Sequence, residues 1–98
     1  MPSPTNYREY VEQVRQATDL AALVSERYTL LANMIVCPFH PDSRPSLNVH
    51  PTKQFFYCFG CKASGDVFTW VERIEGLTFR QAVELLAAKA KIRFFSGH

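Results

Sequence analysis

Two short pairs of metal-binding residue types, Cys37-x-x-His40 and Cys58-x-x-Cys61, flank residues 41–57. A spacer of two residues lets one tight turn direct both side chains of a pair at a common point. Three thiolates and one imidazole are a ligand set that zinc accepts in tetrahedral structural sites. Four protein ligands leave no open coordination position for catalysis. The pattern therefore predicts one structural zinc ion in the arrangement of a zinc ribbon.

Two other uses of these residues remain open at this stage. The odd number of cysteines excludes a complete disulfide framework, and the lack of a secretory signal indicates a reducing compartment. Cys58 and Cys61 could instead form a redox pair, or the thiols could be buried and inert. His50 is a rival fourth ligand, although it belongs to neither pair. Zinc content after replacement of His40 or His50 would distinguish the two ligand sets.

The residues inside each pair should shape the turns around the metal. Pro38 stiffens the first turn, and Gly60 is expected to give the second turn the backbone freedom to close. Phe39 and Phe59 are expected to pack around the ion.

Length and charge limit the function classes. A chain of 98 residues forms one domain with a modest core, to which a metal cross-link would add stability. The net charge of +2 permits binding to nucleic acid but does not argue for it. No apolar run approaches the ~20 residues of a membrane span. We therefore expect a cytoplasmic protein with no membrane partner.

Helices are expected on both sides of the metal-binding segment. Residues 6–18 and 19–27 have apolar stripes of helical period, as do residues 65–76 and 78–92. Asn6 with Glu9, and Thr78 with Gln81, resemble capping boxes, and Gly76 is a natural helix end. The expected buried sides are Tyr7, Tyr10, Val11 and Val14, then Leu20, Leu23 and Val24, then Val67, Phe68, Val71 and Ile74, then Phe79, Ala82, Val83, Leu86 and Ala90. Trp70 is expected at the edge of the core.

The central segment reads as an antiparallel meander of about four strands. The expected strands are residues 28–31, 34–37, 45–50 and 53–58, with turns at Ala32-Asn33 and at residues 51–53. Residues 92–95 could add an edge strand. The predicted fold class is α+β, a zinc ribbon on a small antiparallel sheet with flanking helices at both termini. One domain, 1–98, would comprise a helical lead-in (5–27), the zinc ribbon sheet (28–61) and two helices (65–90).

Several of these motifs together resemble the N-terminal zinc-binding domain of bacterial DnaG-type primases, and the likeness covers nearly the whole chain. They are CPFH at 37–40, PS at 45–46, QF at 54–55, CFGC at 58–61, GDVF at 65–68 and the step at 75–83. The resemblance implies binding of single-stranded template DNA and selection of start sites for RNA primer synthesis in DNA replication. It also implies a primase polymerase domain, in cis or in trans, and a replicative helicase engaged through other domains.

Catalysis is not expected from this chain alone. Its acidic residues form no cluster of the kind that two-metal phosphoryl transfer needs. The chain also departs from the family pattern, because a longer basic hairpin usually precedes the first ligand pair. Here residues 30–36 read LLANMIV, which lacks the charge for phosphate contacts.

A candidate DNA surface follows from the alternation of side chains in residues 53–58. Phe55 and Tyr57 share one face, and Gln54 and Phe56 share the other. Single-stranded DNA is held by aromatic platforms beside basic groups. The predicted DNA-binding residues are Phe55 and Tyr57 for the bases and Arg44, Lys53 and Lys62 for the phosphates. The simpler interpretation is that the aromatic rings fill the core and that the charges are only solvated.

Two other functions remain open. One is a free-standing zinc-ribbon protein of a phage or mobile element that binds DNA. The other is a zinc-stapled module that docks on replication proteins, which the apolar segment 30–36 would suit.

Overall fold

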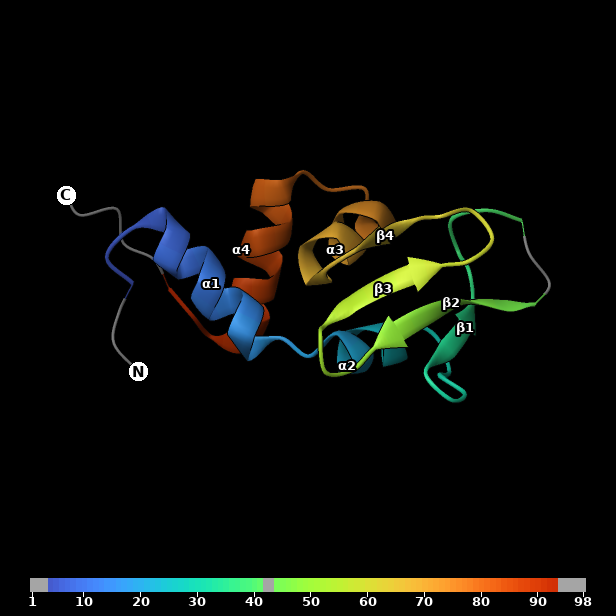
Figure 1. The fold of residues 1–98 in the computed structure, drawn as a ribbon. Coiled ribbons are helices and arrows are strands. Elements are labelled where there is room, and N and C mark those ends of the chain that lie inside the picture. The colour runs from blue at the N-terminus through green and yellow to red at the C-terminus, as the bar shows by residue number, and fades with distance from the viewer. Residues whose placement is uncertain (1–3, 42–43, 94–98) are drawn as a thin grey trace.

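The computed structural model, which describes residues 4–41 and 44–93, has a four-stranded antiparallel sheet, with two helices before it and two after it in the chain (Figure 1). The predicted α+β class, a ribbon sheet flanked by helices, is confirmed. The elements in chain order are α1 (Tyr7–Ala17), α2 (Leu20–Ser25), β1 (Met34–Val36), β2 (Pro45–His50), β3 (Phe55–Cys58), β4 (Ser64–Gly65), α3 (Val67–Glu75) and α4 (Phe79–Ala90).

The sheet and the outer helices occupy opposite ends of the molecule. Strand order follows the chain, β1-β2-β3-β4, so every neighbouring pair is a simple antiparallel connection. In Figure 1, α1 and α4 lie at one end, the sheet lies at the other, and α3 sits between them. Helix α4 packs against both α1 and α3, and α2 packs against β2. Among the described residues, no helix is both long and apolar enough to cross a membrane.

Side-chain caps determine where the first helices begin. The Asn6 side chain accepts a hydrogen bond from the Glu9 N–H, and Asp19 caps α2 by accepting from the Ala22 N–H. Only half of the predicted box at α1 forms, because the Glu9 carboxylate accepts instead from the backbone and hydroxyl of Thr5.

The later helices have the expected ends. Thr78 and Gln81 form a complete capping box at the start of α4. Gly76 ends α3 in the left-handed region, with φ of 68°. Asp66, which was not predicted to be a cap, begins α3 by accepting from the N–H groups of Phe68 and Thr69.

The prediction of a strand at residues 28–31 is wrong. This segment serves instead as the exit from α2, where the Tyr28 N–H donates to the Val24 carbonyl and the Tyr28 ring packs edge-on against Trp70. Leu31 makes only an isolated bridge to Met34. The fourth strand is β4, which the sequence analysis missed because two residues carry no readable alternation.

Side chains alternate along the two central strands, and in β3 this confirms the prediction for Phe55, Phe56 and Tyr57. Leu47 and Val49 of β2 are buried, and so are Phe56 and Cys58 of β3. Their neighbours point to the other side, where cross-strand register aligns Met34, Asn48, Tyr57 and Ser64 in one row and His50 with Phe55 in the next. We call the side that carries Met34, Asn48, His50, Phe55, Tyr57 and Ser64 the open face.

Strand β3 begins at Phe55 and not at residue 53, because the turn occupies residues 51–54. Gln54 adopts φ of 59° there, so it does not share a strand face with Phe56 as predicted. Its side chain accepts from the Leu20 N–H (2.6 Å) and donates to Asp19 (2.9 Å). Gln54 therefore ties the β2–β3 turn to the start of α2.

The core differs from the expectation in two aromatic positions. Trp70 is 2% exposed and lies in the middle of the core, with its ring edge-on to those of Tyr28, Phe39 and Phe56. Phe79 is 43% exposed and covers the ring of Phe68 from outside. Most other predicted core positions are buried, but Tyr7 is exposed and Ile74 and Ala90 are only partly covered. Of the predicted edge strand 92–95, residues 92 and 93 form no strand, and 94–95 lie outside the described residues.

The turn between Leu31 and Met34 supplies a test of local strain. Ala32 and Asn33 have φ of 53° and 62°, the left-handed pair that a tight hairpin turn requires. A left-handed alanine costs about 1–2 kcal/mol, which glycine avoids. We expect Ala32→Gly to raise the free energy of unfolding of the zinc-loaded protein by about 0.5–1 kcal/mol, measured by urea titration. Ala22→Gly, in the exposed part of α2, should lower it by a similar amount. Equal destabilisation by both changes would contradict the strain at Ala32.

Candidate metal centre

The two predicted ligand pairs lie on turns that follow strands of the sheet. Cys37 comes directly after β1, and His40 lies in the turn beyond it. Cys58 is the last residue of β3, and Cys61 lies in the turn that leads to β4. Ile35 and Cys58 both pair with Leu47 of β2, so the two turns leave the sheet close together.

The four side chains converge. Their ligand atoms all lie within 4.8 Å of one another, and the Sγ atoms of Cys37 and Cys61 are 3.8 Å apart. In a tetrahedral zinc site with Zn–S bonds of ~2.3 Å, neighbouring sulfurs are ~3.8 Å apart. A disulfide would need ~2.05 Å. The donor set and its size therefore fit one zinc ion, and zinc is the cofactor of this site.

Backbone N–H groups support the sulfur ligands in both turns. The Phe39 N–H donates to Cys37 Sγ at 3.4 Å. Burial raises the pKa of the Cys37 thiol. Burial also opposes ionisation of Cys58, but the N–H groups of Cys61 and Gly60 point at its sulfur and bring its pKa below the ordinary value. Such hydrogen bonds favour the thiolate, the form in which cysteine binds zinc.

Gly60 serves the site through its size. It does not adopt a positive φ; the left-handed residue of the second turn is Lys62, with φ of 67°. A Cβ atom at residue 60 would stand 2.8 Å from Nε2 of His40 and 3.6 Å from Cys58 Sγ. The predicted role of Gly60 as the flexible residue is therefore wrong. A side chain at this position would displace the imidazole of His40.

The rival ligand His50 lies outside the cluster. Its Nδ1 accepts a hydrogen bond from the Lys53 N–H at 3.1 Å, and its ring stacks on Phe55. Both contacts belong to the β2–β3 turn and not to the ligand turns.

The two phenylalanines of the ligand turns have different surroundings. Phe39 packs against Phe56 and Trp70, and the Arg73 guanidinium lies 4.5 Å from the centre of its ring. Phe59 is 61% exposed and meets Tyr57 edge-on. The expectation that Phe59 packs around the metal is therefore wrong. Phe59 lies two residues beyond Tyr57, and residues two apart in an extended chain share a face, so the sequence already indicated an outward ring.

Four of the five predicted DNA-binding residues fall into two groups, one at each end of β3. Tyr57 contacts Phe59, and the Lys62 ammonium lies 5.9 Å above the Tyr57 ring and donates to the Phe59 carbonyl at 3.4 Å. We call these three residues the knuckle group. Phe55, at the other end of β3, contacts His50, which accepts from the exposed Lys53. Arg44 is exposed in the segment that leads into β2.

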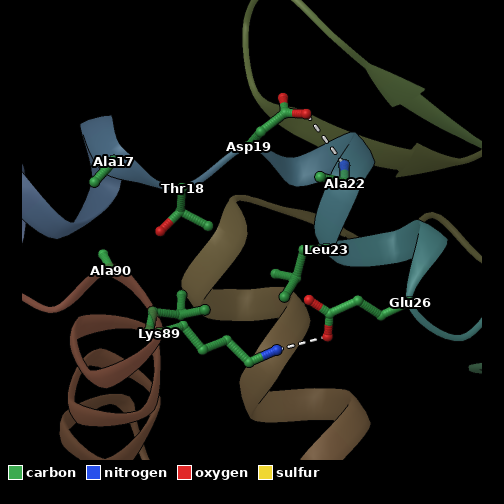
Figure 2. Close-up of a pocket in the computed structure, with 9 residues that line it drawn as sticks. Ala17, Thr18, Asp19, Ala22, Leu23, Glu26, Lys89 and Ala90 are labelled. Carbon is green, nitrogen blue, oxygen red and sulfur yellow. Dashed lines mark hydrogen bonds and ion pairs between the residues drawn. The ribbon is translucent and has the colours of Figure 1, made fainter.

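A pocket of about 140 Å³ at the helical end has no comparable chemistry (Figure 2). Its charged lining residues already have partners. Glu26 and Lys89 form an ion pair at 2.6 Å, and Asp19 caps α2 and accepts from Gln54. The metal-binding cluster and the predicted DNA-binding residues lie instead on the sheet and its turns.

Comparison with known proteins agrees with this assignment. Residues 6–96 match the CHC2 zinc finger family. The chain is 43% identical over 89 residues to the DNA primase of Halalkalibacterium halodurans, which covers 87% of this chain and 15% of that protein. It is 47% identical over 90 residues to the DNA primase of Streptomyces coelicolor, covering 86% and 14%. The crystal structure of the zinc-binding and RNA polymerase domains of the Aquifex aeolicus primase aligns with a TM-score of 0.82 and 31% identity, covering 97% of this chain and 23% of that one.

These similarities first define the class of the protein, which is a zinc ribbon held by three cysteines and one histidine. The chain belongs to the CHC2 zinc finger family and has the fold of a DnaG-type primase zinc-binding domain. It spans about 15% of the length of the curated primases that it matches.

Replacement of each histidine tests the ligand assignment. We expect His40→Ala to lose most of its zinc on dialysis against a chelator, because a tetrahedral site is left with three protein ligands. His50→Ala should keep its zinc, because His50 is engaged in the β2–β3 turn. Zinc per chain, measured by atomic absorption, decides the matter. Loss of zinc from His50→Ala with retention in His40→Ala would show that the assignment is wrong.

A methyl group at residue 60 tests the close packing against His40. Gly60→Ala should weaken zinc binding about 10- to 100-fold, the usual effect of disturbing a group that orients a ligand. Gly76→Ala is the matched control, since its added Cβ meets nothing within 4 Å. It should cost about 1–2 kcal/mol of stability, because φ is positive, but leave zinc affinity unchanged. Competition with a colorimetric chelator measures both variants. Equal zinc affinities would contradict the close approach.

Proposed function

We propose that this chain is the template-recognition domain of a DnaG-type primase. Its open face binds single-stranded DNA and contributes to start-site selection in primer synthesis. Residues 1–98 act as one zinc-binding domain, with residues 5–27, 28–61 and 65–90 as its lead-in, sheet and closing helices. A polymerase domain, in cis as in the matched primases, supplies the nucleotidyl transfer in the cytoplasm. The replicative helicase is engaged through other parts of the protein.

The division of the sheet into two faces supports this proposal. One face buries Ile35, Leu47, Phe56 and Cys58 in the core. On the open face, Phe55 is exposed and Asn48, His50 and Tyr57 are half-buried. An antiparallel sheet with one packed face can present the other face to a ligand.

The proposal rests mainly on the arrangement of the knuckle group. It combines an exposed ring, Phe59, a half-buried ring, Tyr57, and the cation of Lys62. Bases of any sequence can stack on aromatic faces, and a nearby ammonium can contact a phosphate. Tyr57 and Lys62 flank the zinc ligands Cys58 and Cys61 in the chain, so the metal fixes the backbone that carries the group.

The charge on this surface is small. With a net charge of +2, the domain should bind DNA weakly and with a strong dependence on salt. Lys62 lies beyond one end of β3 and Lys53 lies before the other, so the two cations bracket the aromatic rings of that strand. Arg44 would contact a phosphate on the β2 side.

The β1 side of the sheet favours a second candidate function, docking on another replication protein. Leu31 is 70% exposed and Val36 is exposed as well, and neither carries charge. An apolar edge of this kind suits a protein partner better than a phosphate backbone. This function can coexist with DNA binding along β3. A free-standing phage or mobile-element protein would use the same DNA surface, and the complete gene distinguishes that case.

The two lysines give a quantitative test. We expect the double variant Lys53→Ala/Lys62→Ala to weaken binding of a fluorescein-labelled single-stranded oligonucleotide at low salt. Each phosphate contact contributes about 0.7 to the slope of log K against log salt, so the slope should fall by about 1.4. Fluorescence anisotropy over a series of salt concentrations measures both quantities.

The matched control is Arg8→Ala/Arg80→Ala, which removes the same charge from exposed positions on α1 and α4. Binding should change little in this variant, since α1 and α4 lie at the end of the molecule away from the sheet (Figure 1). Equal losses of affinity in the two double variants would show that binding depends only on the net charge of the protein. Absence of binding by the zinc-loaded wild-type protein would refute the DNA proposal and favour the docking function.

A further inference from the structure

The turn end of β3 carries an aromatic pair, His50 and Phe55, of which only Phe55 was predicted to contact DNA. His50 and Phe55 are direct cross-strand partners on the open face. Their rings are stacked, with centroids 5.4 Å apart and planes inclined by 19°. This parallel geometry differs from the edge-on contact of Tyr57 with Phe59, whose planes meet at 74°. A parallel pair presents a flat surface, which a planar base can extend.

The imidazole of His50 is held in one orientation. Its Nδ1 accepts the Lys53 N–H at 3.1 Å. A ring nitrogen that accepts a hydrogen bond carries no proton, so the neutral imidazole has its proton on Nε2. The ring is therefore fixed by a hydrogen bond on one edge and by Phe55 on one face. A side chain that is already ordered loses little conformational entropy when a ligand binds.

The turn beneath this pair is also anchored. The Gln54 N–H donates to the His50 carbonyl at 2.9 Å, and the Gln54 side chain donates to the Pro51 carbonyl at 2.6 Å. The same side chain accepts from the Leu20 N–H of α2. The position of the His50–Phe55 pair is therefore set by the body of the protein and not by a free loop.

The two ends of β3 carry similar chemistry. The knuckle group has two aromatic rings and Lys62, and the turn end has His50, Phe55 and Lys53. From Phe55 to Cys58, the length of β3, the backbone advances by about 10 Å at ~3.3 Å per residue. Aromatic rings thus occur at both ends of β3, and in the chain a lysine lies close to each pair. A DNA strand that follows β3 would meet both groups.

We propose that the His50 imidazole, stacked on Phe55, is a second base-stacking position, and that single-stranded DNA runs along β3 from the ligand turn to the β2–β3 turn. This assignment rests on the proposed function and extends its surface to a residue that the sequence pattern gave no DNA-binding role. The ligand is a nucleobase of a single strand, recognised by its flat face. The Nε2–H group adds a donor for an oxygen of the same strand.

Two substitutions separate the ring of His50 from its hydrogen bond to the turn. His50→Asn keeps a side-chain acceptor for the Lys53 N–H but has no ring. His50→Phe keeps a ring on Phe55 but has no acceptor. If the ring stacks on a base, His50→Asn should weaken binding of a fluorescein-labelled oligonucleotide about ten nucleotides long by at least about fivefold. His50→Phe should stay within about twofold of the wild type.

The measurement uses the zinc-loaded chain, with zinc content and thermal unfolding as checks on the fold. Wild-type affinity in His50→Asn, or an equal loss in His50→Phe, would overturn the stacking role. Tyr57→Ala, measured in parallel, separates this assignment from the proposed function. Binding that needs Tyr57 but is unchanged in His50→Asn refutes only the role of His50. If the wild-type protein does not bind, both proposals fail.

Discussion

Closure of two distant turns on one zinc ion is the constraint on which the rest of the sheet depends. The ligand turns follow β1 and β3, which both border β2 but do not pair with each other. Strand β1 has only three residues and β4 has two, so hydrogen bonds alone would hold the outer strands weakly. Structural zinc sites of this kind contribute to folding directly, because the metal binds the folded arrangement and not the unfolded chain. The metal thus adds to the modest core that a domain of this size can build.

Features that follow from a pattern of residue types along the chain could be predicted from the sequence. Ligand spacing indicated the zinc site, alternation separated the two faces of β2 and β3, and the capping box of α4 is as expected. Features that depend on contacts between distant residues could not be predicted in this way. The segment after α2 has strand-like residues, but its Tyr28 is held by Trp70, and β4 forms only because β3 lies beside it. The sequence also indicated that Gly60 matters, but only the structure shows that the reason is the ring of His40.

The aromatic residues of the ribbon divide according to strand alternation. Phe56 enters the core and joins Phe39 and Trp70 in a cluster next to the ligand turns, in which Trp70 lies edge-on to both phenylalanine rings. The rings on either side of Phe56 point outward and carry the proposed DNA contacts. A shift of β3 by one residue would exchange the two sets, burying the outward rings and exposing the core ring. The zinc ligand Cys58 at the end of β3 opposes such a shift, because its sulfur must reach the metal. The register of β3 in the sheet therefore determines both which rings stabilise the core and which rings lie on the surface.

The side chain of Gln54 has a consequence for any attempt to transplant the ribbon into another protein. Strand bounds alone would suggest that residues 34–65 form a self-sufficient cassette. The β2–β3 turn, however, takes two of its supports, the Leu20 N–H and the Asp19 carboxylate, from the start of α2. A graft that omits this helix would leave the side-chain oxygen of Gln54, and one of its N–H groups, without partners at the tip of the hairpin. The smallest portable unit of this surface thus begins at residue 19, and the helix before the ribbon is part of the surface's own scaffold.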